Sequence, residues 1–485
     1  MQLSKIGFGG YRIDHRVEDH YKALYKALTN GISLIDTSSN YADGSSEILV
    51  GNVLSDLITN NKIKREDVTL VTKGGYIQGQ NYMFALKKKE KGEPFDEVVE
   101  YDEGLWHCIN PEFLEDQINR QMHRLDQPKD SGYIDVYLLH NPEYYLGWAQ
   151  KNNVDLEKAK KEYYSRIKKA FVFLEEKVKE GKIKFYGISS NTFPANSNKY
   201  DFTSLEKVID IANSIGSENH FKFIQLPFNL IESNAIFEKN QKNDTMTVLD
   251  LASANDLRVL INRPLNAITN KGLVRLADFD AREFSEEEFK KQLKLVSFME
   301  NELIKEKIAN VNLRIEASNK LESLLSFGRT FEGKWKDFGT IEHYNDVIEH
   351  HFVTRINMLN AFFEDNITEK DISEYFNNYL KEVYKLFNLL SRFYKNKANQ
   401  RSKFIHLIIN RKCDKLFHNL SLSQKSILLL NSIEGVDCVL VGARREKYIN
   451  DITPSLVHEK INDAKEIFAE LRDELLKMDY TYANL

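Results

Sequence analysis

Short apolar runs recur along the chain, and several are followed by a stretch in which apolar and polar residues repeat with a helical period. The runs are about six residues long and rich in Val, Ile, Leu or Phe. This is typical of strands that are buried on both faces of a parallel sheet. They occupy residues 5–10, 33–38, 69–74, 135–140, 185–190, 223–228, 258–264 and 438–444. The pattern therefore predicts eight parallel strands.

Amphipathic segments lie between several of these runs, for example at residues 21–28, 112–125 and 167–181. Gly31 and Gly181 suit the C-terminal caps of such helices, because glycine readily adopts the left-handed backbone conformation found there. Eight alternating β and α units are typical of a closed barrel. We therefore expect an α/β fold of the (β/α)8 TIM barrel type.

About 150 residues between 263–267 and the predicted helix 421–433 break this alternation. Apolar residues recur there at three- and four-residue spacing over 286–306, 343–363 and 371–394, which indicates amphipathic helices. We expect an all-α insertion between strand seven and helix seven. The expected organisation is the first seven βα units in 1–270, the helical insertion on the catalytic face in 271–415, and the last βα unit with a C-terminal tail in 416–485.

Composition narrows the class of protein. The chain has 485 residues and a net charge of −5, so it lacks the basic excess that a broad nucleic-acid-binding surface needs. Cys108, Cys413 and Cys438 are too far apart in the sequence to indicate a disulfide framework or a paired-cysteine zinc site. The sequence shows no signal-peptide-like apolar region at its start and no run of about 18 apolar residues. We therefore expect a cytoplasmic protein that binds neither nucleic acid nor membranes.

Four polar residues lie at, or just beyond, the C-terminal ends of predicted strands two, three and four. They are Asp36, Tyr41, Lys73 and His140. In a barrel these strand ends converge on one mouth, where the active site lies. A single tyrosine in a loop, or a single lysine after a strand, is usually a packing or solvated residue. Four such residues on consecutive strand ends indicate a catalytic set.

The chemistry of these residue types fits a general acid. A free tyrosine hydroxyl has a pKa of about 10 and gives up its proton reluctantly near neutral pH. A neighbouring Lys73 ammonium is expected to lower the pKa of Tyr41, and Asp36 is expected to keep Lys73 charged and in place. His140 could hydrogen-bond a substrate carbonyl and orient it. Together they predict a proton donor tuned towards working pH.

In order and in strand context these four residues match the Asp-Tyr-Lys-His catalytic set of the aldo-keto reductase family, which the chain resembles. Segments 38–51, 187–192 and 439–452 are similar to further motifs of that family, and the resemblance covers about residues 3–270 and 415–455. It implies NADPH as cofactor, with NADH as a second candidate, and no metal. It also implies a small-molecule substrate, an aldehyde, ketone or sugar carbonyl, which takes a hydride from the cofactor and a proton from the tyrosine.

The resemblance further implies residues that bind the cofactor. Gln225, together with Ser189 and Ser190, would hold the nicotinamide amide. Asn262 stands where members of the family often have an aromatic residue that stacks on the nicotinamide ring, so stacking is lost or supplied from elsewhere. The implied cofactor-binding residues are Gly10, Tyr11, Asp36, Ser189, Ser190, Gln225, Asn262, Arg263, Pro264, Leu265, Gly442, Ala443, Arg444, Arg445, Tyr448 and Asp451.

The last predicted strand precedes the residues implied for the adenosine end of the cofactor. Gly442, Ala443 and Arg444 would lie along the adenosine phosphate, and Tyr448 and Asp451 near the adenine and its ribose. Arg444 and the arginine that follows it could pair with a 2′-phosphate, because a guanidinium binds phosphate well. This favours NADPH over NADH.

Two long segments are candidates for shaping the substrate site. Residues 76–111 form a long predicted loop after strand three, which is either a functional lid or an ordered surface excursion. Trp106 or His107 in that loop could line the substrate site. The insertion could cap the active site, set the size of the substrate, or form a contact between copies of the chain in a homo-oligomer.

Two alternatives remain open at this point. The barrel could be a cofactor-binding regulatory subunit with vestigial catalysis, in which case the helical insertion would bind a partner. Dehydrogenation of a sugar or polyol, which is the reverse reaction, would use the same residues. Oxidation of NADPH in the presence of a panel of carbonyl compounds distinguishes the regulator from the enzyme, whereas the sequence does not decide the direction of the reaction.

Overall fold

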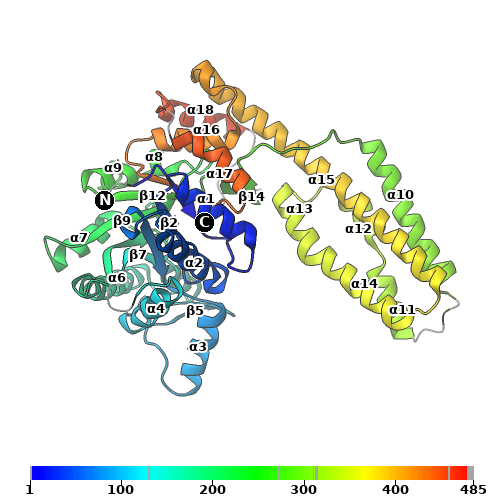
Figure 1. Ribbon diagram of the computed structural model, residues 1–485, viewed down its shortest axis with the longest axis horizontal. Helices are drawn as coiled ribbons and strands as arrows, with labels where there is room; N and C mark the ends of the chain where they lie inside the picture. The colour runs from blue at the N-terminus through cyan, green and yellow to red at the C-terminus, as the bar shows by residue number, and fades with distance from the viewer. Residues whose placement is uncertain are drawn as a thin grey trace. The chain divides into compact units, whose positions relative to one another are not determined.

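The computed structural model describes residues 3–128, 132–270, 272–309, 311, 315–456 and 459–477. The chain divides into two units (Figure 1). Among the described residues, the first unit contains those of 3–265 and 412–474, and the second contains those of 266–411 together with 475–477. The first unit is an α/β barrel, and the second is mainly helical.

Eight parallel strands close into a barrel, which confirms the predicted fold class. Around the barrel the order is β1–β15–β12–β9–β8–β7–β3–β2, so the last strand of the chain pairs with both the first and the seventh barrel strand. Each strand overlaps one of the eight apolar runs. The strands are β1 Ile6–Gly9, β2 Leu34–Asp36, β3 Thr69–Gly74, β7 Ile134–His140, β8 Ile183–Ser189, β9 Phe221–Pro227, β12 Arg258–Asn262 and β15 Cys438–Val441.

Helices follow the barrel strands. Some begin at residues that satisfy the free backbone N–H groups of a first turn: the Asn110 side chain accepts from Glu112 N in front of Pro111, and Ser421 and Gln424 form a capping box. The helices of this unit are α1 Glu18–Thr29, α2 Ser45–Thr59, α4 Pro111–Arg124, α5 Tyr144–Lys151, α6 Leu156–Lys179, α7 Leu205–Ile215, α8 Asn234–Phe237, α9 Val248–Ala254, α16 Leu422–Ser432, α17 Glu446–Ile452 and α18 Ala464–Lys477.

The inside of the barrel is a packed apolar core rather than a channel. Its buried residues come from six of the eight strands and include Val71, Leu138 and Leu260. Leu3 and Phe185 pack against this core as partly buried side chains. Because the interior is filled, chemistry is confined to the two ends of the barrel.

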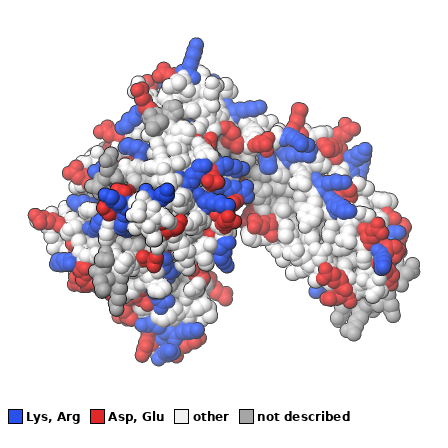
Figure 2. Space-filling view, viewed as in Figure 1, with Lys and Arg blue, Asp and Glu red and all other residues white. Residues whose placement is uncertain are grey.

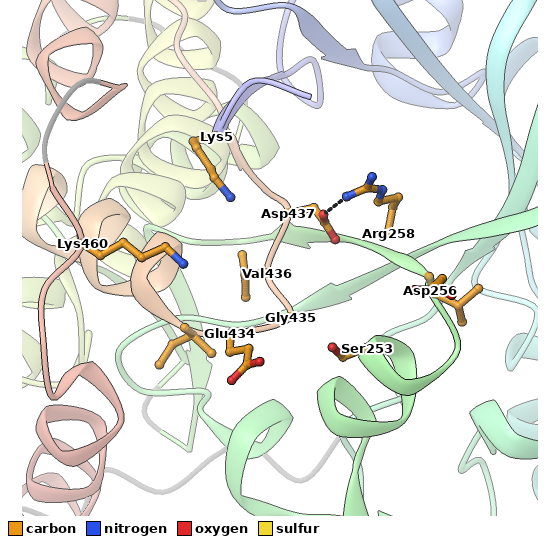
Figure 3. A pocket seen from close by; sticks show the side chains of 11 residues that line it. Lys5, Ser253, Asp256, Arg258, Glu434, Gly435, Val436, Asp437 and Lys460 are labelled. Atoms are coloured by element: carbon orange, nitrogen blue, oxygen red, sulfur yellow. Dashed lines mark hydrogen bonds and ion pairs between the residues drawn. The ribbon is translucent and has the colours of Figure 1, made fainter. Parts of the chain in front are cut away.

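A cavity of about 360 Å³ lies at the end of the barrel where the strands begin (Figure 3). Lys5 precedes β1, Arg258 begins β12, and Asp437 precedes β15; all three line the cavity. Asp437 accepts hydrogen bonds from Arg258 Nη1 and from Val259 N, each at 2.8 Å. The cavity is therefore at the opposite end from the predicted catalytic residues, at the end that generally serves stability in this fold.

Residues 76–111, for which the sequence left open a functional lid or an ordered surface excursion, contain regular secondary structure. They form a three-stranded antiparallel sheet in the order β4–β6–β5, with strands Tyr76–Ile77, Leu105–His107 and Val99–Asp102, together with the helix α3 Gly79–Glu90. The strands are short, and β4 pairs with β6 across about 30 residues of intervening chain, so no periodic pattern predicts this sheet. The segment is an ordered addition to the barrel.

The second unit confirms that the chain contains a large helical region, and it has its own core, but it is not all-α as predicted. It begins with a hairpin that the sequence analysis did not predict, β13 Asn266–Thr269 and β14 Gly272–Arg275. Buried aromatic residues connect its helices; for example, the rings of Phe363 and Phe376 stack at 3.7 Å. The helices are α10 Glu286–Glu302, α11 Ile315–Leu324, α12 Phe327–Lys334, α13 Ile341–Val347, α14 Val353–Asn366 and α15 Lys370–Lys412.

The charged surface in view is mixed. Lys and Arg side chains are interspersed with Asp and Glu over the face shown in Figure 2. This differs from the single-sign basic stripe that is typical of a nucleic-acid-binding surface. Within the described residues, no helix combines the length and the apolar character needed to cross a membrane.

Candidate functional site

The four predicted catalytic residues converge at the mouth formed by the C-terminal ends of the barrel strands. Asp36 ends β2, Lys73 lies in β3, His140 ends β7, and Tyr41 begins a short 3-10 helix, η1 Tyr41–Gly44. Lys73 Nζ donates to Asp36 Oδ2 at 2.7 Å and to Tyr41 Oη at 3.0 Å. Asp36, Lys73 and Tyr41 therefore form one hydrogen-bonded set, with the His140 ring beside Tyr41.

A strained turn holds Tyr41 in this position. Ala42 and Asp43 adopt positive φ angles of 46° and 55°, and Gly44 follows with a φ of 85°. Only glycine adopts this region without cost, so the two non-glycine residues store conformational strain beside the site. Asp43 Oδ1 accepts a hydrogen bond from Gln80 N at 2.9 Å, which ties the turn to α3.

Burial dominates the electrostatics of the set. Lys73 is fully buried, and burial lowers the pKa of its ammonium although Asp36 favours the charged form. Burial, followed by the charge of Asp36, raises the pKa of Tyr41 well above its usual value. Tyr41 therefore does not have the lowered pKa that the sequence predicted, because burial of the hydroxyl disfavours its charged form.

His140 is held as a neutral ring at the mouth. Its Nδ1 lies 3.1 Å from Ser38 Oγ, and its ring packs edge-on against Tyr41 at 5.8 Å and Tyr76 at 4.7 Å. Burial and the charge of Lys73 keep the pKa of His140 well below its usual value. A neutral imidazole can hydrogen-bond a carbonyl oxygen without bringing a second positive charge into the site.

Three of the residues implied for the nicotinamide meet above the barrel core. Gln225, in β9, donates from Nε2 to Asp36 Oδ1 at 2.7 Å. Its Oε1 accepts from Ser189 Oγ at 3.1 Å and from Asn262 Nδ2 at 3.4 Å. Gly10 N also donates to the backbone oxygen of Asp36, at 2.8 Å. The structure thus links the residues implied for the cofactor directly to Asp36, a connection that sequence reasoning missed.

Some implied cofactor residues have other partners in this structure. Ser190 is fully buried, and its hydroxyl lies 3.2 Å from that of Thr192. Asp451 accepts from Ser421 Oγ at 3.4 Å. Arg263 Nη2 pairs with Glu232 Oε1 at 2.9 Å. Pro264 and Leu265 follow Arg263 in a turn beyond β12, and Tyr11 is exposed with its ring 5.2 Å from that of Tyr41.

The residues implied for the adenosine end are mostly exposed. Gly442 directly follows β15, and a side chain added there would meet only Gly9 O, at 3.7 Å. Arg444 is exposed and lies close enough to His20 for its charge to help lower the pKa of that ring, although burial is the larger cause. Arg445 Nε lies 3.7 Å from Asp19 Oδ2, with most of its side chain in solvent. Tyr448 is exposed, whereas Ala443 is buried.

The two candidate substrate residues point to different surroundings. His107 Nε2 donates to the backbone oxygen of His140 at 2.8 Å, and its ring stacks on Tyr144 at 5.6 Å. Burial lowers the pKa of His107 to about 4, so it is neutral. Trp106 instead packs against Tyr82, with ring centroids 4.8 Å apart. His107 therefore contacts the backbone of His140, and Trp106 belongs to the packing of α3.

Sequence reasoning missed several residues around His140. Asn141 Nδ2 donates to Tyr76 Oη at 2.8 Å, and Glu143 Oε1 accepts from Asn191 N at 2.8 Å. The sequence could have indicated Asn141 and Glu143, because these polar residues directly follow a buried strand. For metals, the described residues contain no group of three or more His, Cys, Asp or Glu placed to hold an ion.

Comparisons with known proteins identify a family. The sequence model described as the aldo/keto reductase family matches residues 5–319. The NADH-specific methylglyoxal reductase of Escherichia coli is 29% identical over 146 residues, which covers 28% of this chain and 38% of that protein. The uncharacterized oxidoreductase YqkF of Bacillus subtilis is 23% identical over 190 residues, covering 39% and 46%. The chain thus spans less than half the length of these relatives.

The structural comparison matches this chain to solved structures that are named as an aldo/keto reductase and a glycerol dehydrogenase. An aldo/keto reductase from Klebsiella pneumoniae, in complex with NADP and acetate, is 15% identical with a TM-score of 0.43, covering 100% of this chain and 93% of that one. The glycerol dehydrogenase of Gluconobacter oxydans is 14% identical with a TM-score of 0.47, covering 97% and 92%. The family assignment rests on the sequence model, which matches well over half of the chain.

Proposed function

The chain belongs to the aldo/keto reductase family, and on that premise we propose that it is an NADPH-dependent oxidoreductase acting on a carbonyl compound, with Tyr41 as general acid. The observation that carries the proposal is the contact set at the barrel mouth. Lys73 Nζ lies 3.0 Å from Tyr41 Oη and 2.7 Å from Asp36 Oδ2. A hydroxyl held by a buried ammonium is suited to deliver a proton to an oxygen that is gaining negative charge.

The raised pKa of Tyr41 indicates the stage of the reaction at which Lys73 acts. Because burial raises that pKa, Tyr41 is protonated at neutral pH, which is the form that reduction needs. Once the proton has passed to the substrate oxygen, the remaining phenolate accepts the hydrogen bond from Lys73 Nζ. Asp36 keeps Lys73 in place for this step. Lys73 therefore stabilises the state after proton transfer, where the charge appears.

The chain's own residues fit a nicotinamide dinucleotide. Asn262 Oδ1 is buried without a hydrogen-bond partner among the described residues, so an amide N–H arriving at the mouth would satisfy it. Gln225 and Ser189 adjoin Asn262 and would hold the nicotinamide carboxamide with it. The open backbone at Gly442 and the exposed Arg445 would hold the adenosine end. When bound, the nicotinamide supplies the hydride.

The identity of cofactor and substrate is open to direct assay. Exposed arginines after β15 favour NADPH because a guanidinium pairs well with a 2′-phosphate. The name of the E. coli relative specifies NADH and methylglyoxal, so both nicotinamide cofactors and that aldehyde belong in the panel. His140, neutral and anchored by Ser38, would orient the substrate carbonyl.

The test is the variant Tyr41→Phe, assayed for steady-state NADPH oxidation with a panel of aldehydes, ketones and sugars. We expect turnover to fall by about 10²–10⁴-fold, because general-acid catalysis contributes that much. Cofactor affinity, measured by nicotinamide fluorescence, should stay unchanged. The matched control is Tyr384→Phe, at an exposed tyrosine of α15, which should keep the parent rate.

Two results would overturn the proposal. Parent-like turnover of Tyr41→Phe would remove Tyr41 as the acid. Tight NADPH binding by the parent protein, with no turnover of any carbonyl in the panel, would favour a cofactor-binding regulatory role instead.

A further inference from the structure

Glu143 is a buried carboxyl between two strand ends of the barrel mouth. It is only 7% exposed, and it lies three residues beyond His140, at the start of α5. Its Oε1 accepts a hydrogen bond from Asn191 N at 2.8 Å. Asn191 follows the end of β8, and the backbone of Asn141 in turn donates to Ser189 O at 2.7 Å. Glu143 thus connects the segment after His140 with the segment that carries Ser189.

One oxygen of this carboxyl is left without a bond. Glu143 Oε2 is buried and has no hydrogen-bond partner among the described residues, although the Ser190 hydroxyl is close enough to lower the pKa of the carboxyl. A buried carboxylate oxygen without a partner is costly, so its presence calls for an explanation.

Ser190 is the nearest member of a buried row of hydroxyl groups. The Oγ of Ser190 lies 3.2 Å from Thr192 Oγ1, which lies 2.9 Å from Thr203 Oγ1. Tyr163 Oη, from α6, lies 2.9 Å from the same Thr203 oxygen. Each hydroxyl can donate only one proton. The donor-to-acceptor direction of the hydrogen bonds along the row therefore depends on the group next to its end. Glu143 is the titratable acid at that end.

The surroundings of Glu143 make its charge sensitive to pH near neutrality. Burial raises the pKa of Glu143 to about 7, and the negative charge of Asp201 acts in the same direction. The other groups that feel its charge are Tyr76 from β4, Tyr144 from α5 and Tyr163 from α6, and burial raises the pKa of each. No cation is among these groups in the described part of the chain. Near pH 7, Glu143 is therefore the member of this group that changes charge.

We propose that Glu143 is a positioning residue whose ionised form fixes residues 189–191 in the geometry that binds the nicotinamide, so that cofactor affinity depends on pH. This inference rests on the proposed function, because Ser189 is assigned to the nicotinamide there. In the ionised form the carboxylate holds Asn191 N–H with a charge-assisted bond, and Oε2 can accept from the Ser190 hydroxyl once that hydroxyl turns towards it. In the protonated form Oε2 becomes a donor, and the Ser190 hydroxyl must turn away.

The sign of the effect follows from linkage. If the ionised carboxyl favours binding, its pKa is lower in the complex than in the free protein. Affinity is then fully present above the free-protein value of about 7 and is lost as the pH falls through it. A difference of one pKa unit between the two states corresponds to about a tenfold change in affinity.

The experiment is a pH series of cofactor dissociation constants, from about pH 5.5 to about pH 8.5, on the full chain. NADPH binding is followed by fluorescence for the parent, Glu143→Gln and Glu157→Gln. Glu157 is an exposed carboxyl in the first turn of α6 and is the matched control. Because the 2′-phosphate of NADPH also titrates in this range, the readout is the difference between each variant and the parent. The melting temperature of each protein is recorded in parallel.

We expect the parent to lose roughly three- to tenfold in affinity between about pH 8 and pH 6, beyond the loss seen in Glu143→Gln. Glu157→Gln should follow the parent. As a second variant that leaves Glu143 intact, Asp201→Asn removes a charge that raises the pKa of Glu143, so the midpoint should move to lower pH.

The outcomes separate this inference from the proposed function. Identical profiles for the parent and Glu143→Gln, with both binding NADPH, overturn the role of Glu143 and leave the reductase assignment standing. If the Gln variant does not fold, a parent-like midpoint in Asp201→Asn overturns the inference instead. Absence of NADPH binding by the folded parent overturns both.

Discussion

The two ends of the barrel carry polar residues in different ways. At the C-terminal mouth, Asp36, Lys73 and Gln225 are almost fully buried and bonded to one another across three strands. At the other end, Arg258 and Asp437 form an ion pair with the arginine half in solvent. Both ends therefore have charge, but of these two ion pairs only the one at the mouth keeps both partners away from water.

This difference indicates that the ion pair at the mouth serves chemistry and the ion pair at the other end serves stability. A buried ion pair is costly to assemble and is weak evidence of stabilisation, so its presence at the mouth needs a functional reason. The ion pair at the other end lies beside the cavity of Figure 3, and its aspartate also accepts from a strand N–H, which is a structural task. Substitutions at the two ends should therefore affect different measurements.

The largest expected effect comes from Lys73→Met at the mouth. It removes the donor to Tyr41, and turnover should fall by about 10²–10⁴-fold. It also leaves Asp36 buried without its cation, which should lower the free energy of unfolding by about 3–5 kcal/mol. Steady-state kinetics and urea titration measure the two effects.

A double variant and a matched control sharpen this prediction. Asp36→Asn combined with Lys73→Met removes the unpaired charge, so stability should return while turnover does not. Lys460→Met, at an exposed lysine lining the cavity at the other end, should leave both unchanged. Recovery of turnover in the double variant would contradict the catalytic role of Lys73.

A smaller effect is expected at the adenosine end of the mouth, from Arg445→Ala. Arg445 is mostly exposed and makes only a 3.7 Å ion pair with Asp19, so it is available to a 2′-phosphate. Losing a charge-assisted hydrogen bond should weaken NADPH binding by about tenfold and leave NADH binding unchanged. Fluorescence titration with both cofactors tests this. An equal loss of affinity for NADPH and NADH would show that Arg445 does not bind the 2′-phosphate.

The smallest effect is expected at the opposite end, from Asp437→Asn. The variant weakens the bonds to Arg258 and to Val259 N, and should lower the free energy of unfolding by about 1 kcal/mol. Turnover should match the parent. Glu434→Gln, at an exposed carboxyl of the same cavity, serves as the control. A large loss of turnover in Asp437→Asn would remove the distinction between the two ends.

The sequence was informative wherever a local pattern determines structure. All eight barrel strands coincide with apolar runs, because a strand buried on both faces must be apolar throughout. The convergence of Asp36, Lys73 and Tyr41 was predictable, since strand ends of a barrel share one mouth. The helices of the insertion were predictable from their three- and four-residue periodicity.

Features that depend on pairing across the chain could not be predicted. The strands Tyr76–Ile77 and Leu105–His107 are too short to show a period, and they find each other only in the folded protein. The hydrogen bond between Gln225 and Asp36 joins β9 and β2, which lie on opposite sides of the barrel. The raised pKa of Tyr41 comes from the depth of its burial, and residue spacing carries no such information.

The position of the insertion has a consequence for how the chain folds. β15 pairs with both β1 and β12, so the barrel cannot close until the residues Cys438–Val441 have been synthesised. The helical unit precedes them and has its own hydrophobic core, so it can fold as a unit before β15 is available. Once folded, it shortens the flexible loop that β15 must close and so lowers the entropic cost of closure. Damage to the insertion should therefore appear first as slow assembly of the barrel, in protein that is catalytically normal once folded.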